Sequence, residues 1–173
     1  MADAGRVIAG SAKGVRLAAP GPGTRPLTDR VKQTLFGILE PELEGAAVLD
    51  LFAGSGAGGI EALSRGAASA VFVERGAGAV RVIAEILRRT GLEAGATIVC
   101  RDAVAWLAAG AKGAANGEGT RFDIVLVDPP YVDTASLVRV LEIVGPVVRE
   151  GGVVVSKHFW RDTPPPGIGL LAS

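Results

Sequence analysis

Four acidic residues stand where apolar runs end, and they are the first candidates for chemistry. They are Asp50 in AVLDLF (47–52), Glu74 in AVFVER (70–75), Asp102 in TIVCRD (97–102) and Asp128 in FDIVLVD (122–128). Carboxylates gathered at one edge of a fold repel one another unless positive charge or hydrogen-bond donors lie among them. The pattern therefore favours a ligand that carries cationic and hydroxyl groups.

A glycine-rich stretch after Asp50 supplies the second half of a ligand site. Gly54, Gly56 and Gly59 form a G-x-G-x-x-G pattern that opens a predicted helix. Glycines let the backbone approach a ligand closely, and the N–H groups of a first helical turn attract negative groups. S-adenosylmethionine fits both halves, because it carries an ammonium, a sulfonium, ribose hydroxyls and an adenine amine together with a carboxylate. NAD would satisfy Glu74 equally well, but Asp50 would repel its pyrophosphate.

These residues can form one ligand site only if the strands that carry them end at the same edge of a sheet. The predicted strands are the apolar runs 47–52, 70–75, 97–102, 122–128 and 151–158, with helices near 57–66, 77–90, 103–111 and 134–144. This alternation predicts an α/β fold with a doubly wound, mainly parallel sheet, in which ligands bind at the carboxyl ends of the strands. The segment GAKGAANGEGT (110–120) is predicted to be a loop.

The N-terminal residues follow a different pattern. Runs 6–10 and 15–20, separated by residues 11–14, predict a β-hairpin. Thr28 is a candidate cap for a helix with an apolar face, and the residues of that face at helical spacing are Val31, Leu35, Ile38 and Leu39.

Charge is distributed unevenly along the chain. The 173 residues have a net charge of zero, yet residues 1–32 contain six basic side chains and two acidic ones. A basic segment attached to an acidic body indicates contact with a polyanion. No apolar run approaches the ~18 residues that a membrane-spanning helix needs. The single cysteine, Cys100, fits a reducing cytoplasm.

The tetrad Asp128-Pro129-Pro130-Tyr131 resembles the (D/N)PP(Y/F) signature of methyltransferases that modify exocyclic amino nitrogens. The resemblance implies that the Asp128 carboxylate and the Pro129 carbonyl accept hydrogen bonds from the two N–H groups of the amine. These hydrogen bonds would localise on the nitrogen a lone pair that is otherwise delocalised into the ring. Tyr131 would stack on the base, a contact worth roughly 1–3 kcal/mol. A nitrogen held in line with the methyl group could react through positioning and electrostatics.

The N-terminal segments narrow the resemblance. RVIAGSAKGVRLAAP and TRPLTDRVKQTLFGIL, followed by VLDLFAGSGAGGIEALSRGA, are similar to the bacterial family that methylates the N2 amine of a guanine in 16S ribosomal RNA. The similarity implies a Rossmann-like methyltransferase fold, with a basic hairpin extension over residues 1–22 and an S-adenosylmethionine-dependent domain over residues 23–173. The implied partner is 16S ribosomal RNA within a 30S subunit or assembly intermediate, and neither a metal nor a membrane is implied.

The resemblance also assigns site residues. Donor binding is implied for Asp50, Ala53, Gly54, Gly56, Glu74, Asp102 and Asp128. Contact with RNA phosphates is implied for Arg6, Lys13, Arg16, Arg25, Arg30 and Lys32, and Arg30 could also orient the base. His158 matches no catalytic position of the family and is predicted to be a surface residue.

Two departures and several alternatives accompany this interpretation. Gly58 stands where the family usually has a hydrophobic residue, and the chain ends at GIGLLAS, before the final strands of the family, so the sheet is predicted to be incomplete. The alternatives are an NAD-dependent oxidoreductase and a catalytically inactive RNA-binding relative. A DNA adenine methyltransferase shares the tetrad but usually needs a separate recognition region.

Overall fold

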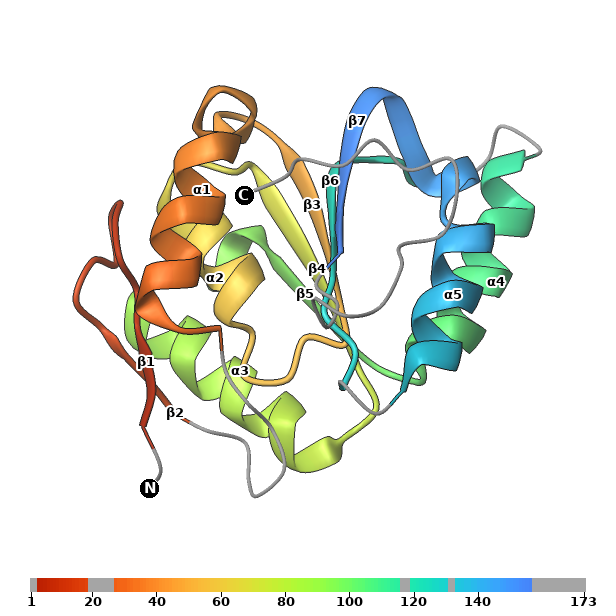
Figure 1. Ribbon diagram of the computed structural model, residues 1–173. Coiled ribbons are helices and arrows are strands. Elements are labelled where there is room, and N and C mark those ends of the chain that lie inside the picture. Colours follow the sequence, from red (N-terminus) through yellow and green to blue (C-terminus); the bar gives the residue numbers. More distant parts are fainter. Residues whose placement is uncertain (1–2, 19–26, 116–118, 131–132, 157–173) are drawn as a thin grey trace.

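The central feature of the computed structural model, which describes residues 3–18, 27–115, 119–130 and 133–156, is a five-stranded sheet in the order β5-β4-β3-β6-β7 (Figure 1). The strands are β3 (Ala47–Leu51), β4 (Ser69–Glu74), β5 (Ala96–Cys100), β6 (Phe122–Val127) and β7 (Val148–Ser156). All neighbouring strands pair in parallel. The predicted doubly wound parallel sheet is confirmed, and each strand lies where an apolar run predicted it.

Helices cover both faces of this sheet (Figure 1). One face holds α1 (Asp29–Leu43), α2 (Ala57–Ser64) and α3 (Ala77–Thr90); the other holds α4 (Ala103–Ala115) and α5 (Thr134–Ile143). Short turns η1 (Glu93–Gly95) and η2 (Gly145–Val147) precede β5 and β7. Consecutive residues of β3 serve the two cores: Val48 packs in the cluster of Ile60 of α2, and Leu49 packs in the cluster of Leu107 of α4. Burial on both faces explains the apolar strand sequences.

Helix α1 begins as predicted but buries only part of the predicted apolar face. Thr28 caps the helix, since its Oγ1 accepts a hydrogen bond from the Val31 amide at 3.3 Å. The buried residues are Lys32, Phe36, Leu39 and Leu43. Of the predicted apolar face, Leu39 is buried and Leu35 packs partly buried against the core, whereas Val31 and Ile38 are 42% and 47% exposed. The apolar spacing therefore predicted the buried face only in part.

Helix α4 corrects a second prediction. The segment 110–120 was predicted to be a loop, yet α4 continues to Ala115. Alanine is the strongest helix former, and it offsets the glycines in this stretch.

The N-terminal hairpin forms a separate two-stranded antiparallel sheet beside α2 and α3 (Figure 1). Its strands are β1 (Asp3–Arg6) and β2 (Arg16–Ala18). The pairing continues past β1, because the Val7 amide donates to the Val15 carbonyl at 2.9 Å. Val7 and Leu17 are buried in the same core cluster as α1 and α2, so the hairpin packs on the sheet domain.

Candidate active site

The predicted acids meet at one edge of the sheet. Asp50 lies in β3, Glu74 ends β4, and Asp128 follows β6, while β3 is hydrogen-bonded to both β4 and β6. The chain adds strands outward from β3 to β5 and then returns to β6 on the other side of β3. This reversal of strand order is where open α/β sheets bind ligands. The structure therefore brings Asp50, Glu74 and Asp128 together at the switch point.

Asp50 is the most perturbed acid of the site. Its side chain is almost fully buried, and its Oδ2 accepts a hydrogen bond from the Gly59 amide at 2.8 Å. Burial raises the pKa of Asp50 to about 7, against the lowering effect of that hydrogen bond and with help from the charges of Asp128 and Glu74. A cationic ligand group beside this carboxylate would favour its ionised form.

The glycine loop leaves the start of α2 open. Gly56 is the N-cap residue in the left-handed conformation, with φ of 73°, and has no side chain to cap the helix, while Asp50 binds the Gly59 amide of the first turn. Gly59 lies against β4, because a Cβ on it would be 2.3 Å from the ring of Phe72. The backbone is strained at Phe52, a non-glycine residue with φ of 59°. The first amides of α2 that precede Gly59 are the candidates for a negative ligand group.

Glu74 binds the loop that follows β3 and the loop that follows β4. Its Oε2 accepts from the Gly54 amide at 2.9 Å, and its Oε1 accepts from the Gly76 amide at 2.7 Å. The amide of Ala53, which is buried, donates to the Val73 carbonyl at 3.1 Å. Each carboxylate oxygen keeps a second acceptor direction for a hydroxyl group.

Asp102 follows β5 at the same edge and caps α4. Its Oδ1 accepts from the Ala105 amide at 2.9 Å, and the residue is exposed. One carboxylate oxygen is used in this cap. The other is the candidate acceptor for a ligand amine.

The tetrad begins at the end of β6, on the strand next to that of Asp50. The amide of Asp128 approaches the Leu51 carbonyl at 3.5 Å, and Pro129 is buried. Tyr131 lies outside the described residues. Beyond it, the Asp133 amide donates to the Pro130 carbonyl at 2.8 Å, and the Asp133 carboxylate caps α5 through Ser136 at 3.1 Å. The sequence reasoning missed Asp133, whose spacing before a helix was the available signal.

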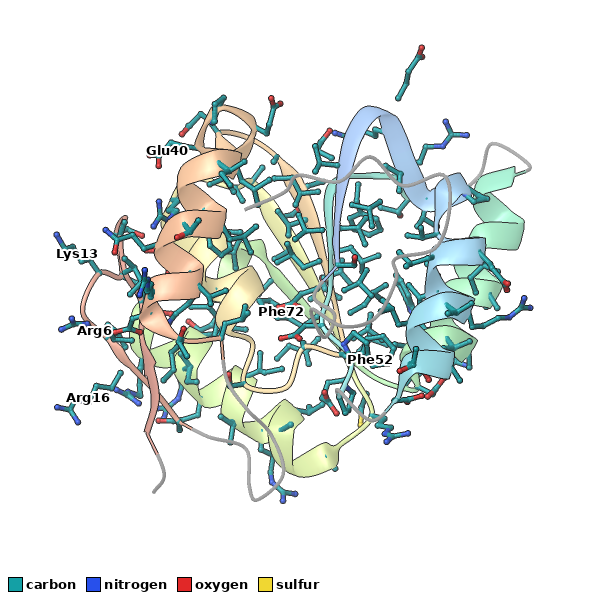
Figure 2. All side chains as sticks on the ribbon, viewed as in Figure 1. Arg6, Lys13, Arg16, Glu40, Phe52 and Phe72 are labelled. Carbon is teal, nitrogen blue, oxygen red and sulfur yellow. The ribbon has the colours of Figure 1, made fainter. Side chains whose placement is uncertain are left out.

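The predicted RNA-binding residues divide into exposed and buried groups. Figure 2 shows Arg6, Lys13 and Arg16 projecting outward from the hairpin, and Arg30 is exposed on α1. Arg25 and His158 lie outside the described residues. Lys32 corrects the prediction: its side chain is fully buried and its Nζ donates to the Arg6 carbonyl. A cation in that position holds the backbone and cannot reach an RNA phosphate.

Within the described parts of the chain, no helix has the length and apolar character to cross a membrane, and no group of three or more histidine, cysteine or acidic residues could hold a metal ion.

The strand order, the open glycine-rich helix start and the acids at the strand ends define a Rossmann-like methyltransferase. Solved structures agree: "Putative methyltransferase yhhF from Escherichia coli" superimposes with a TM-score of 0.78 at 33% identity, over 93% of this chain and 85% of that one. A hypothetical protein of Thermus thermophilus gives a TM-score of 0.79 at 37% identity, over 94% and 91% of the two chains.

The chain belongs to the family described as Conserved hypothetical protein 95, whose model matches residues 5–172. It is 39% identical to "Putative rRNA methyltransferase YlbH" of Bacillus subtilis (strain 168) over 169 residues, which is 96% of this chain and 89% of the relative. It is 43% identical to "Ribosomal RNA small subunit methyltransferase D" of Escherichia coli (strain K12) over 128 residues, which is 73% of this chain and 60% of the relative. The family resemblance predicted from the sequence is confirmed, and the NAD-dependent oxidoreductase is not favoured.

Proposed function

We propose that the protein transfers a methyl group from S-adenosylmethionine to the N2 amine of a guanine in 16S ribosomal RNA. The observation that supports this most is the position of Asp128 at the end of β6, next to β3 at the switch point, where its charge acts on the buried carboxylate of Asp50. The names of the relatives add the substrate class, since one is named for ribosomal RNA of the small subunit. We infer that the protein acts in the cytoplasm, where it would bind the small ribosomal subunit or one of its assembly intermediates.

The donor fits the residues of the site. The glycine-rich start of α2 suits the carboxylate of the donor, and the buried Asp50 suits its cationic groups. Glu74 keeps acceptor capacity for the ribose hydroxyls, and Asp102 keeps one oxygen for the adenine amine. Gly54, Gly56 and Ala53 would let the backbone follow the ligand. When bound, S-adenosylmethionine supplies an electrophilic methyl group on a positively charged sulfur.

The tetrad Asp128-Pro129-Pro130-Tyr131 would bind the amine that accepts the methyl group. The carboxylate of Asp128 and the carbonyl of Pro129 would accept hydrogen bonds from the two N–H groups of the guanine amine, which favours a pyramidal nitrogen with a localised lone pair. Tyr131 would stack on the guanine and hold it in line with the methyl group, and a paired guanine would first have to leave its stack. Positioning and electrostatic stabilisation then supply most of the rate enhancement.

The RNA would lie along the hairpin. Arg6, Lys13, Arg16 and Arg30 present exposed cations from β1, its turn, β2 and the start of α1, and we include Arg25 from the connecting segment. Phosphate contacts of this kind position a nucleic acid without reading its sequence. We therefore expect a folded ribosomal particle to be a better substrate than naked RNA.

Transfer of a labelled methyl group tests this function. The protein is incubated with labelled S-adenosylmethionine and either naked 16S RNA or 30S particles, and the product nucleosides are analysed. N2-methylguanine, with more product from particles, is the expected result. Methylation of another nucleoside would overturn the proposed acceptor. Donor binding by calorimetry without transfer to either RNA would instead support the inactive RNA-binding relative.

A further inference from the structure

Buried polar side chains gather at two places in the described parts of the chain. The residues concerned are Lys32, Asp50, Ser55, Glu61 and Ser64. Asp50 belongs to the proposed donor site and Ser55 to the glycine-rich loop beside it, whereas the other three all contact the N-terminal hairpin or the turn at its tip. Burying charged groups costs free energy that apolar packing would avoid. At the hairpin this cost is offset by hydrogen bonds to backbone groups of the hairpin.

Glu61 of α2 holds the chain just after β1. Its side chain is fully buried; Oε2 accepts from the Ile8 amide at 2.8 Å and Oε1 accepts from the Ala9 amide at 3.1 Å. The guanidinium of Arg65 lies 2.8 Å from Oε1 and balances the charge. Two successive backbone amides are thus fixed by one carboxylate, which sets both the position and the direction of the hairpin.

Ser64, the last residue of α2, holds the turn of the hairpin. Its Oγ accepts from the Ala12 amide at 2.9 Å and donates to the Ala9 carbonyl at 2.6 Å, while its carbonyl accepts from the Ser11 amide at 2.7 Å. The turn rests directly on the helix end, because a Cβ on Gly10 would lie 1.7 Å from the Ser64 carbonyl oxygen. No residue other than glycine fits at that position.

Lys32 and Asp29 of α1 hold the end of β1. The Lys32 ammonium donates to the Arg6 carbonyl, and it lies 3.4 Å from a carboxylate oxygen of Asp29. Asp29 in turn accepts from the Arg6 amide and from Arg6 Nε, each at 3.2 Å. The hairpin is therefore attached to two helices through its backbone, which leaves the side chains of Lys13 and Arg16 directed outward (Figure 2).

Helix α2 joins the attachments made by Glu61 and Ser64 to the donor site. Its first turn follows Gly56 and binds Asp50 through the Gly59 amide, and its second half contains Glu61 and Ser64. Eight helical residues span about 12 Å, so one rigid element connects both sites.

We propose that Glu61, Ser64 and Lys32 are positioning residues for the RNA substrate, which hold the basic hairpin at a set place relative to the donor site. This inference rests on the proposed function, in which the hairpin contacts RNA. Apolar packing by Val7 and Leu17 would keep the hairpin attached, but hydrogen bonds to successive amides fix its register. The contribution is to kcat/KM for RNA and not to donor binding.

The test compares Glu61→Gln and Ser64→Ala with the unchanged protein in methyl transfer to 30S particles. Glutamine keeps the size of Glu61, but it has one acceptor oxygen for two amides and loses the charge that faces Arg65. We expect kcat/KM for the particle to fall about tenfold. The Kd for S-adenosylmethionine, measured by calorimetry, should change less than about twofold. The matched control is Glu85→Gln, which removes an exposed carboxylate paired with Arg88 on α3 and should change neither quantity.

The outcomes separate this inference from the function on which it rests. A lower melting temperature with unchanged kcat/KM, assayed well below that temperature, would show a merely structural role and overturn the inference. Equal losses in donor affinity and kcat/KM would also overturn it, because the change would then act through the start of α2. If Glu61→Gln does not fold, the smaller change Ser64→Ala decides. An unchanged protein that neither binds nor methylates particles would overturn the proposed function itself.

Discussion

The carboxylate of Asp50 and the amide of Gly59 are joined by a hydrogen bond of 2.8 Å, which ties the end of β3 to the first turn of α2. The bond keeps an acid inside the protein, next to the helix start that would bind the donor. Burial, together with the nearby charges of Asp128 and Glu74, raises the pKa of Asp50 to about 7. The protonation state of this one group should therefore change near neutral pH.

Donor affinity should depend on pH through Asp50. The ionised carboxylate attracts the cationic groups of S-adenosylmethionine, whereas below about pH 7 the free protein must first lose a proton. We expect the Kd to fall about tenfold between about pH 6 and pH 8 and to level off above that. Calorimetry in buffers of different ionisation enthalpy should detect proton release at the lower pH. Asp50→Asn should bind weakly with no such release, and a pH-independent Kd in the unchanged protein would contradict the assignment.

The same group should lower the stability of the ligand-free protein at neutral and higher pH. Its pKa in the unfolded chain is about 3.9, so the folded state holds the proton more tightly and loses stability as the pH rises towards about 7. Asp50→Asn removes that charge and should raise the free energy of unfolding at about pH 8 by roughly 2–4 kcal/mol. Urea unfolding at about pH 5 and about pH 8 measures the difference. A gain no larger at the higher pH than at the lower would contradict this account.

Substitution of Asp128 separates transfer from donor binding. Asp128→Ala removes the proposed acceptor for the guanine amine, so we expect transfer to fall at least about 100-fold. The Kd for S-adenosylmethionine should stay nearly unchanged, as measured by calorimetry on the same preparation. Equal losses of transfer and donor binding would show that Asp128 acts mainly on the donor. Asp133→Ala, which removes the cap of α5 without touching the proposed acceptor, should reduce transfer less.

The outward cations of the hairpin should set the salt dependence of RNA binding. Lys13→Ala with Arg16→Ala removes two exposed charges and should lower the slope of log K against log salt concentration by about 1.4. Filter binding of 30S particles over a range of salt concentrations measures the slope. Arg139→Ala, which removes an exposed charge from α5, should leave it unchanged. The same slope in the hairpin variant would place the RNA elsewhere.

Close packing of α2 on β4 should make Gly59 sensitive to a single added carbon. In Gly59→Ala the Cβ would lie 2.3 Å from the Phe72 ring, so either the ring or the helix must move. We expect a loss of roughly 1–3 kcal/mol in the free energy of unfolding and weaker donor binding. Gly78→Ala on α3 meets no atom within 4 Å and should stabilise the protein by up to about 1 kcal/mol. Equal effects of the two changes in urea unfolding would contradict the packing argument.

Much of the fold, and the gathering of acids at one edge of the sheet, could be predicted from local patterns. Apolar runs predicted the strands, turn residues predicted the hairpin, and acids at strand ends predicted the ligand edge, because each signal depends on a few neighbouring residues. The same patterns predicted the buried face of α1 only in part: Leu39 is buried, but Val31 and Ile38 are exposed, and Lys32 is buried. Apolar spacing could not reveal that a lysine would find a carbonyl partner 26 positions away in the chain.

The chemistry expected of the glycine-rich loop after Asp50 and of Asp128-Pro129 follows from the residue types and their order along the chain. How the hairpin is held was decided by the tertiary structure alone. Glu61 and Ser64 lie more than fifty residues from the amides that they bind, and nothing in their local sequence distinguishes them from ordinary helix residues. Their role appears only when α2 packs beside the hairpin, since hydrogen bonds between distant segments depend on the packing of the whole domain.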